Sequence, residues 1–339
     1  MKNLKTTGLV FFCVLCGSLM FASPIELTGG DLKLILYPDT GSFSLLKLSE
    51  VGKNRYESLF EDRNFSTTSW FSVMVNGRIF KLAKKPGKPI VAEQTVLGAR
   101  FVFTLTDDFQ VEQLFSFINN STTGTPRAVL ITTRIENTSG KPGVFALKAL
   151  FDTMLGESEG IHFTTNIQKR ISSETRIVTA VNPDNVIISQ NKNLSCAFYL
   201  YGSGASRPDT VYISNWERLN TLTWFPDFVE GRSFNTLYSV NDSALLFVWP
   251  EKTLQANDKL SVSMVLGPFS SDISSSSSSV SKSAASATVV PVDAASTQAT
   301  IQQLLDRIAE IEANPGSASD DELIRLNNDL DTMLQQIKE

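Results

Sequence analysis

The chain has 339 residues and a mass of 37.3 kDa, enough for roughly two domains at about 150 residues per domain. Hydrophobic residues make up 42% and charged residues 19%, with 22 Phe, which excludes a wholly disordered or collagen-like chain. The 30 Lys and Arg against 35 Asp and Glu give a net charge of −5, so no nucleic-acid partner is expected. One His and three Cys leave little material for transition-metal or nucleophilic chemistry.

Residues 1–22 have the pattern of a secretory signal peptide. Two Lys precede an apolar stretch, residues 8–21, that is too short for a stable membrane span, and small residues follow it. We expect cleavage between Ala22 and Ser23; an uncleaved anchor and a lipid on Cys16 are the alternatives. The pattern predicts export to the periplasm or cell surface of a bacterium, with no transmembrane span after cleavage.

The strand signals follow one another through residues 23–269. Asn76-Gly77 stands between the alternating runs 71–75 and 78–82, which is the strongest short signal of a β-hairpin. Further β-branched and aromatic runs cover residues 101–105, 111–118 and 128–137, and no convincing helix lies between them. This pattern predicts a large antiparallel β-sandwich.

The character of the chain changes after the sandwich. Residues 270–295 are rich in Ser and Ala, with six consecutive Ser, and are predicted to be a flexible linker. Residues 296–339 show helical periodicity, broken at Asn314-Pro315-Gly316, and so predict a coiled-coil-like α-helical hairpin. Its apolar stripes need a further surface, so we expect self-association or a protein partner; docking of the helices back onto the sandwich is the alternative that the linker permits. The expected assembly residues are Ile301, Leu304, Ile308, Ile311, Leu323, Leu326, Leu330, Met333 and Ile337.

The sequence gives no catalytic residue. Nucleotide-binding loops, metalloprotease motifs and nucleophile elbows are absent from it. His162, the only imidazole, stands in a strand-like run without a nucleophile motif, so we interpret it as structural. Cys196 is left without a disulfide partner once the signal peptide is removed, and is interpreted as a small buried hydrophobe.

An acidic turn follows the apolar run 146–151. Asp152, Glu157 and Glu159 stand within eight residues, and their carboxylates could hold a hard cation such as Ca²⁺. The spacing is not that of an EF-hand, and a structural turn in which Asp152 accepts hydrogen bonds from backbone amides is the alternative. No cofactor is otherwise expected.

Large aromatic residues gather in the segment 216–249. Exposed side by side, Trp216, Trp224 and Trp249 could stack on sugar rings and bind a glycan. The alternative is that they fill the core of the sandwich, as large aromatic residues usually do.

One resemblance spans residues 130–267. An Asn-ending strand at Asn137, the run Asp152-Thr153-Met154-Leu155-Gly156 with its acidic Gly turn, and the pieces 208–216 and 246–250 resemble uncharacterised exported bacterial β-sandwich proteins. The chain departs from their pattern at residues 255–258, where a Pro-Gly turn is typical. The resemblance implies a secreted sandwich and a fold-specific role for Asp152 and Gly156, and it implies no catalytic residue.

Two function classes follow from these patterns. The first is a non-enzymatic exported cell-envelope protein, with a β-sandwich interaction domain and a helical assembly module. The second is a carbohydrate-binding or carbohydrate-active sandwich protein. Fold alone does not choose between them.

Overall fold

The structure is a computed structural model that describes residues 23–270, apart from 51–53, 62–66, 87, 89, 121–122, 159 and 203, together with Arg307. The chain divides into two compact units, residues 1–280 and 281–339. The predicted signal peptide, the linker beyond Ser270 and the helical hairpin 296–339 lie outside the described residues, Arg307 excepted. These three assignments therefore stay predictions.

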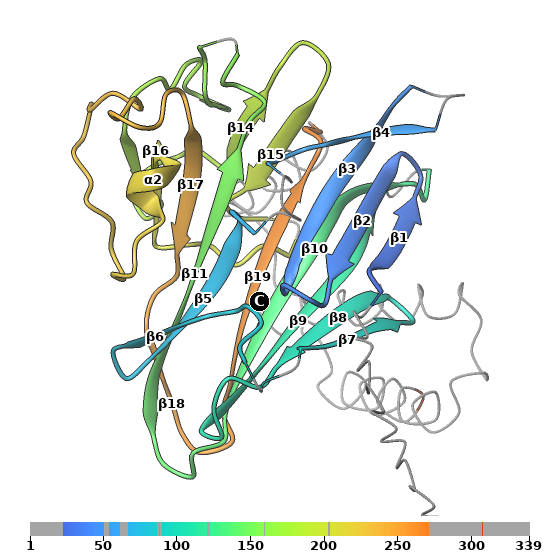
Figure 1. Cartoon of the computed structure of the whole chain (residues 1–339), viewed down its shortest axis with the longest axis vertical. Helices are drawn as coiled ribbons and strands as arrows, with labels where there is room; N and C mark the ends of the chain where they lie inside the picture. Colours follow the sequence, from blue (N-terminus) through green and yellow to red (C-terminus); the bar gives the residue numbers. More distant parts are fainter. Residues whose placement is uncertain are drawn as a thin grey trace, which may run out of the picture. The chain divides into compact units, whose positions relative to one another are not determined.

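The described residues form three antiparallel sheets (Figure 1). The four-stranded sheet has the order β1 (Ile25–Gly29), β2 (Leu32–Tyr37), β3 (Ser42–Glu50) and β4 (Arg55–Ser58). The eight-stranded sheet has the order β12 (Thr164–Thr165), β14 (Val186–Gln190), β15 (Ser195–Tyr199), β19 (Lys259–Gly267), β10 (Pro126–Asn137), β9 (Phe109–Asn119), β8 (Gly98–Phe103) and β7 (Ile90–Thr95). The seven-stranded sheet contains β13 (Thr175–Val178), β16 (Thr210–Asn215), β17 (Ser243–Val248), β11 (Gly143–Thr153), β5 (Trp70–Val75), β6 (Arg78–Lys81) and β18 (Lys252–Leu254), which pairs with β11.

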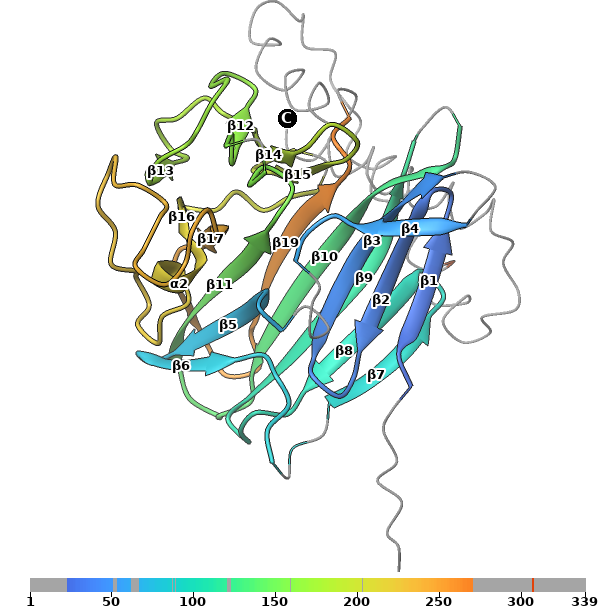
Figure 2. The ribbon, with the colours of Figure 1, turned by 45° about the horizontal axis from the view of Figure 1, so that its top comes forward.

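One hydrophobic core joins the three sheets, and its Phe rings show how the sheets meet. The Phe43 ring of the four-stranded sheet lies 5.1 Å from the Phe115 ring of the eight-stranded sheet, between ring centroids. The Phe151 ring of the seven-stranded sheet lies 5.1 Å from the Phe198 ring of the eight-stranded sheet. Both smaller sheets therefore pack against the same face of the eight-stranded sheet, and Figure 2 shows β1–β3 beside β8–β10. The predicted mainly β, sandwich-like fold is confirmed for the described residues.

The predicted hairpin at Asn76-Gly77 is confirmed. Asn76 and Gly77 have φ values of 49° and 79°, and they connect β5 to β6. Two consecutive left-handed residues make the turn whose twist matches that of paired strands, and Asn and Gly adopt this conformation most easily. Few other residue pairs adopt two consecutive left-handed conformations, which is why Asn-Gly predicts a hairpin here.

The outer face of the seven-stranded sheet is covered by the loop 216–242. The loop begins with α2 (Trp216–Leu219), a four-residue helix that the strand patterns did not predict. The Asn215 side chain accepts a hydrogen bond from the Glu217 backbone N–H at 2.9 Å, so a single capping residue fixes this turn. Within the described residues, no helix is both long and apolar enough to cross a membrane.

Lys148 is fully buried under this loop, on the outer face of β11. Its ammonium donates to the carbonyl oxygen of Thr223 at 2.7 Å and lies over the rings of Trp70 and Trp224, 5.4 and 5.3 Å from their centroids. Burial lowers the pKa of Lys148 to about 8. The lysine therefore anchors the loop to the sheet through carbonyl and cation–π contacts.

Candidate ligand-binding site on the outer sheet face

Four adjacent strands of the eight-stranded sheet, β19, β10, β9 and β8, place charged side chains on its outer face. In β9, Val111 and Phe115 point into the core, so Gln110 and Glu112 point outward, because side chains alternate along a strand. Glu112 pairs with Arg134 of β10 in the strand register. The alternation and the strand order together therefore assemble a polar surface from side chains that are far apart in the sequence.

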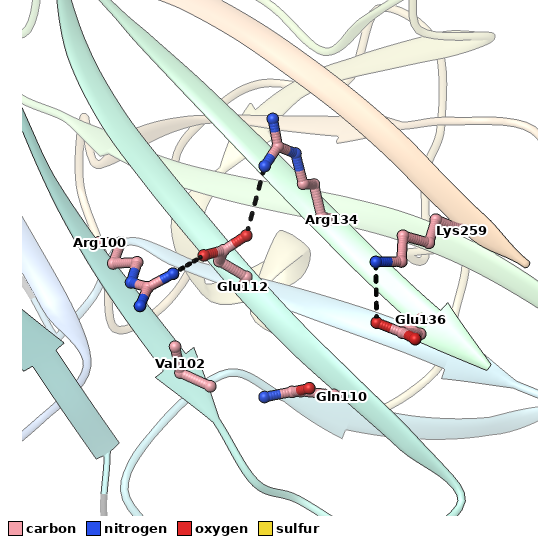
Figure 3. A pocket seen from close by; sticks show the side chains of 7 residues that line it. All are labelled: Arg100, Val102, Gln110, Glu112, Arg134, Glu136 and Lys259. Carbon is pink, nitrogen blue, oxygen red and sulfur yellow. Dashed lines mark hydrogen bonds and ion pairs between the residues drawn. The ribbon is translucent and has the colours of Figure 1, made fainter. Parts of the chain in front are cut away.

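This surface contains a depression of about 340 Å³, shown in Figure 3. It lies over β8, β9, β10 and β19, and Val102 is its one aliphatic lining side chain. The lining residues are Arg100, Val102, Gln110, Glu112, Arg134, Glu136 and Lys259. The site is therefore an open, predominantly charged depression on a rigid sheet.

Ion pairs order the charged side chains of the depression. Arg100 donates to Glu112 Oε1 at 2.7 Å and also to Glu93, which lies next to it on β7. Arg134 Nη1 lies 3.5 Å from Glu112 Oε2. These contacts make a chain of alternating charges across four strands, with Glu112 between two guanidinium groups.

A second ion pair closes the opposite end of the depression. Lys259 Nζ lies 3.2 Å from Glu136 Oε2, and the two residues are paired in the register of β19 and β10. Gln110 pairs with Glu136 on the other side of β10 and adds an amide, which can both donate and accept. The depression thus offers hydrogen-bond donors and acceptors side by side, with one aliphatic side chain among them.

The structure does not bring the three predicted Trp ligands together on one surface. Trp249 lies in the core between the sheets, is 4% exposed, and donates from Nε1 to the Ser206 carbonyl at 2.9 Å. Trp224 and the half-buried Trp216 pack instead on the outer face of the seven-stranded sheet. Trp216 Nε1 donates to the Thr68 carbonyl at 2.9 Å. Their role as sugar-binding residues stays a prediction.

Two of the three predicted metal ligands lie close to each other, and the third, Glu159, lies outside the described residues. Asp152 is 6% exposed at the end of β11. Glu157 Oε1 accepts a hydrogen bond from the Ser243 backbone N–H at 3.0 Å. In the part of the chain that the structure describes, no group of three or more His, Cys, Asp or Glu is arranged to hold a metal ion. The calcium site stays a prediction.

Burial raises the pKa values of the two described carboxyl groups of the acidic turn. It raises the pKa of Asp152 to about 8, and the negative charges of Asp242, Glu61 and Glu157 contribute to this shift. Burial also raises the pKa of Glu157 to about 7, although its hydrogen bond from Ser243 opposes the shift. Four carboxyl groups, from the acidic turn and from the segments of Glu61 and Asp242, thus lie near one another, and protonation relieves their mutual repulsion.

The residues of the sequence resemblance have structural roles. The Asn137 side chain donates to the carbonyl oxygens of Lys141, Leu254 and Gln255 at 2.8, 3.1 and 3.0 Å, and so ties two turns together. A Cβ at Gly156 would lie 2.4 Å from the backbone oxygen of His162, so only glycine fits this close approach.

The single His and the single Cys of the sandwich are both buried. His162 is 4% exposed, and its ring lies 4.4 Å from that of Phe234 between centroids. Burial lowers the pKa of His162, with a smaller effect from the charge of Arg170. Burial raises the pKa of the Cys196 thiol, which is fully buried. Neither side chain lines the depression on the outer face.

The predicted assembly residues, from Ile301 to Ile337, lie outside the described residues. The lining residues of the depression were missed altogether by the sequence analysis. The available signal was the polar half of each alternating strand, such as Arg100 in β8 and Glu112 in β9. That signal identifies outward-facing positions but not which strands become neighbours.

No protein-family model matches the chain, and the search of curated proteins gave no significant match. Several solved structures are similar to it. A galactose mutarotase-related enzyme from Lactobacillus acidophilus has 9% identity and a TM-score of 0.43, covering 73% of this chain and 98% of its own. An aldose epimerase homologue from C. elegans gives the same identity, TM-score and coverage. A polysaccharide lyase has 11% identity and a TM-score of 0.41, covering 74% of this chain and 34% of its own. At these values the likeness does not extend to an activity or a substrate.

Proposed function

We propose that the β-sandwich binds a carbohydrate in the depression on the outer face of its eight-stranded sheet. The observation that carries this proposal is the lining: hydrogen-bond donors and acceptors lie side by side, together with the aliphatic side chain of Val102. A volume of about 340 Å³ falls at the lower end of the range of roughly 300–1,000 Å³ for small-molecule sites. A short saccharide segment suits a depression of this size.

Sugar hydroxyl groups match the lining chemically, because each hydroxyl can donate and accept a hydrogen bond at once. Arg100 and Arg134 supply donors, Glu112 and Glu136 supply acceptors, and Gln110 supplies both. The ion pairs of Arg100 with Glu93 and Glu112 hold these side chains in place before a ligand arrives, which reduces the entropy lost on binding.

The position of the site on β-strands supports the same proposal. Groups that project from paired strands are held more firmly than groups on loops, so their spacing can select one arrangement of hydroxyls. The proposal retains two predictions from the sequence. The chain is exported to the cell envelope, and its C-terminal helices bind a protein partner or a second copy.

A glycan array probed with the full-length mature protein tests the proposal. We expect selective binding to one group of glycans, and we expect Glu112→Gln to weaken it at least about tenfold, because Glu112 contacts two of the lining guanidinium groups. Glu26→Gln is the matched control, since Glu26 forms an exposed ion pair with Lys33 on the four-stranded sheet. Binding to no glycan, or equal weakening by the two variants, would contradict the proposal.

A further inference from the structure

The three cationic side chains of the depression are not equally engaged by their neighbours. Arg100 is held between two carboxylates, those of Glu93 and Glu112. The hydrogen bonds to Glu112 and Glu93 raise the pKa of Arg100. This guanidinium is therefore largely occupied by protein partners.

Arg134 and Lys259 are held more loosely. Within the described residues, Arg134 forms an ion pair only with Glu112, at 3.5 Å, and that carboxylate is already bonded to Arg100 at 2.7 Å. Lys259 contacts Glu136 at 3.2 Å. The side chains of Arg134 and Lys259 are 52% and 62% exposed, and exposed ion pairs of this kind contribute little to stability. Their donors can therefore turn to a ligand at small cost.

The two loosely held cations lie on the same side of the depression. Arg134 is on β10 and pairs with Ser261 of β19, two residues from Lys259 on the same face. Figure 3 shows both on the β10–β19 side, with Arg100 on the opposite side across Glu112. An anionic group bound there would meet a planar guanidinium and an ammonium together.

The charges around the depression favour a single negative group on the ligand. Arg100 is balanced by Glu93 and Glu112, so the cations that can turn to an anion are Arg134 and Lys259. A second negative charge on the ligand would face Glu112 or Glu136.

We infer that the sugar bound in this depression carries one carboxylate, as a uronic acid residue does, and that Arg134 and Lys259 bind that carboxylate. The inference rests on the proposed carbohydrate function and adds the class of sugar. The remaining hydroxyl groups of the ring face Glu112, Glu136 and Gln110.

Affinity measurements on matched glycans test this inference. The full-length mature protein is titrated with uronate-containing oligosaccharides, with the same oligosaccharides after chemical reduction of their carboxyl groups, and with neutral and sulfated oligosaccharides. We expect carboxyl reduction to weaken binding at least about tenfold, because hydrogen bonds to charged groups are among the stronger ones. Arg134→Gln and Lys259→Gln should weaken uronate binding to a similar degree, and should weaken binding of the reduced glycan by a smaller factor.

Lys84→Gln is the control, because Lys84 is also an exposed lysine in an ion pair, at 3.0 Å from Asp39. Equal affinity for a glycan before and after carboxyl reduction would overturn the inference and leave the proposed function standing. Tighter binding of sulfated glycans than of uronates would overturn the assignment of a carboxylate. Binding to none of the four glycan classes would overturn the proposed function itself.

Discussion

The buried carboxyl group of Asp152 makes the stability of the sandwich depend on pH. Its pKa is raised from the ordinary 3.8 to about 8, chiefly by burial. Between these two values the folded chain keeps a proton that the unfolded chain has lost. Stability contributed by this proton is therefore present at low pH and is lost as the pH rises toward 8.

The size of the effect follows from one proton. Each pH unit between 5 and 7 lowers the free energy of unfolding by about 1.4 kcal/mol, or about 2.7 kcal/mol over the interval. For a domain of this size, this corresponds to roughly 5–10 °C in melting temperature. Glu157 acts in the same direction, because its pKa is raised to about 7. His162 changes the stability in the opposite direction. Burial lowers its pKa, so the unfolded chain binds the extra proton and stability rises with pH.

Asp152→Asn isolates the contribution of Asp152. Denaturant unfolding of the wild type and of the variant at pH 5, 6 and 7 should give a difference in unfolding free energy that shifts by about 2.7 kcal/mol in favour of the variant. Asp107→Asn serves as the control, since the Asp107 side chain is 99% exposed. Parallel pH profiles for the wild type and Asp152→Asn would refute the reasoning, because Asp152 would then titrate alike in the folded and unfolded chains.

Two further substitutions test the packing around the sheets. Glu174→Gln should lower the free energy of unfolding by about 2–4 kcal/mol, because the fully buried Glu174 binds both Arg218 and Arg232, the latter at 2.8 Å. If chemical denaturation shows that the free energy of unfolding falls by less than about 1 kcal/mol, this prediction is wrong. Gly98→Ala should destabilise more than Gly140→Ala, because a Cβ at Gly98 would lie 1.9 Å from a backbone oxygen of β9, whereas a Cβ at Gly140 meets nothing within 4 Å. Equal melting temperatures for the two variants would count against this close approach.

Export is tested by the N-terminus of the purified envelope protein. Mass spectrometry should find the mature chain beginning at Ser23, since a basic start, an apolar stretch and small residues direct signal cleavage. A chain that retains Met1, or one that carries a lipid on Cys16, would contradict this prediction.

The sequence predicts the strands of this fold because their signals are local. Asn76-Gly77 specifies a hairpin through two left-handed residues, and alternating runs such as 111–118 specify which side chains face the core. The segment 216–249 was less predictable. Its dense aromatic residues fit a sugar-binding surface or a core, and only the structure separates Trp249, between the sheets, from Trp224 on the outer face.

The candidate site was not predictable from the sequence for a physical reason. Its charged residues become neighbours through the strand order β8-β9-β10-β19, in which β19 joins β10 from the far end of the sandwich sequence. Arg134 meets Ser261 and Glu136 meets Lys259 only in that register. Alternation assigns each side chain to a face, but no local signal says which distant strand will pair with β10.

The most direct test of the carbohydrate site is a methyl NMR spectrum of the full-length mature protein, recorded during titration with the tightest-binding array glycan. Val102 lines the depression, Val73 is fully buried in the core, and Val181 is 83% exposed outside the depression. The account predicts saturable shifts of the Val102 methyl signals, with those of Val73 and Val181 unchanged. Saturable binding that leaves the Val102 methyl signals unchanged, or that shifts the Val181 signals instead, would contradict a carbohydrate site in this depression.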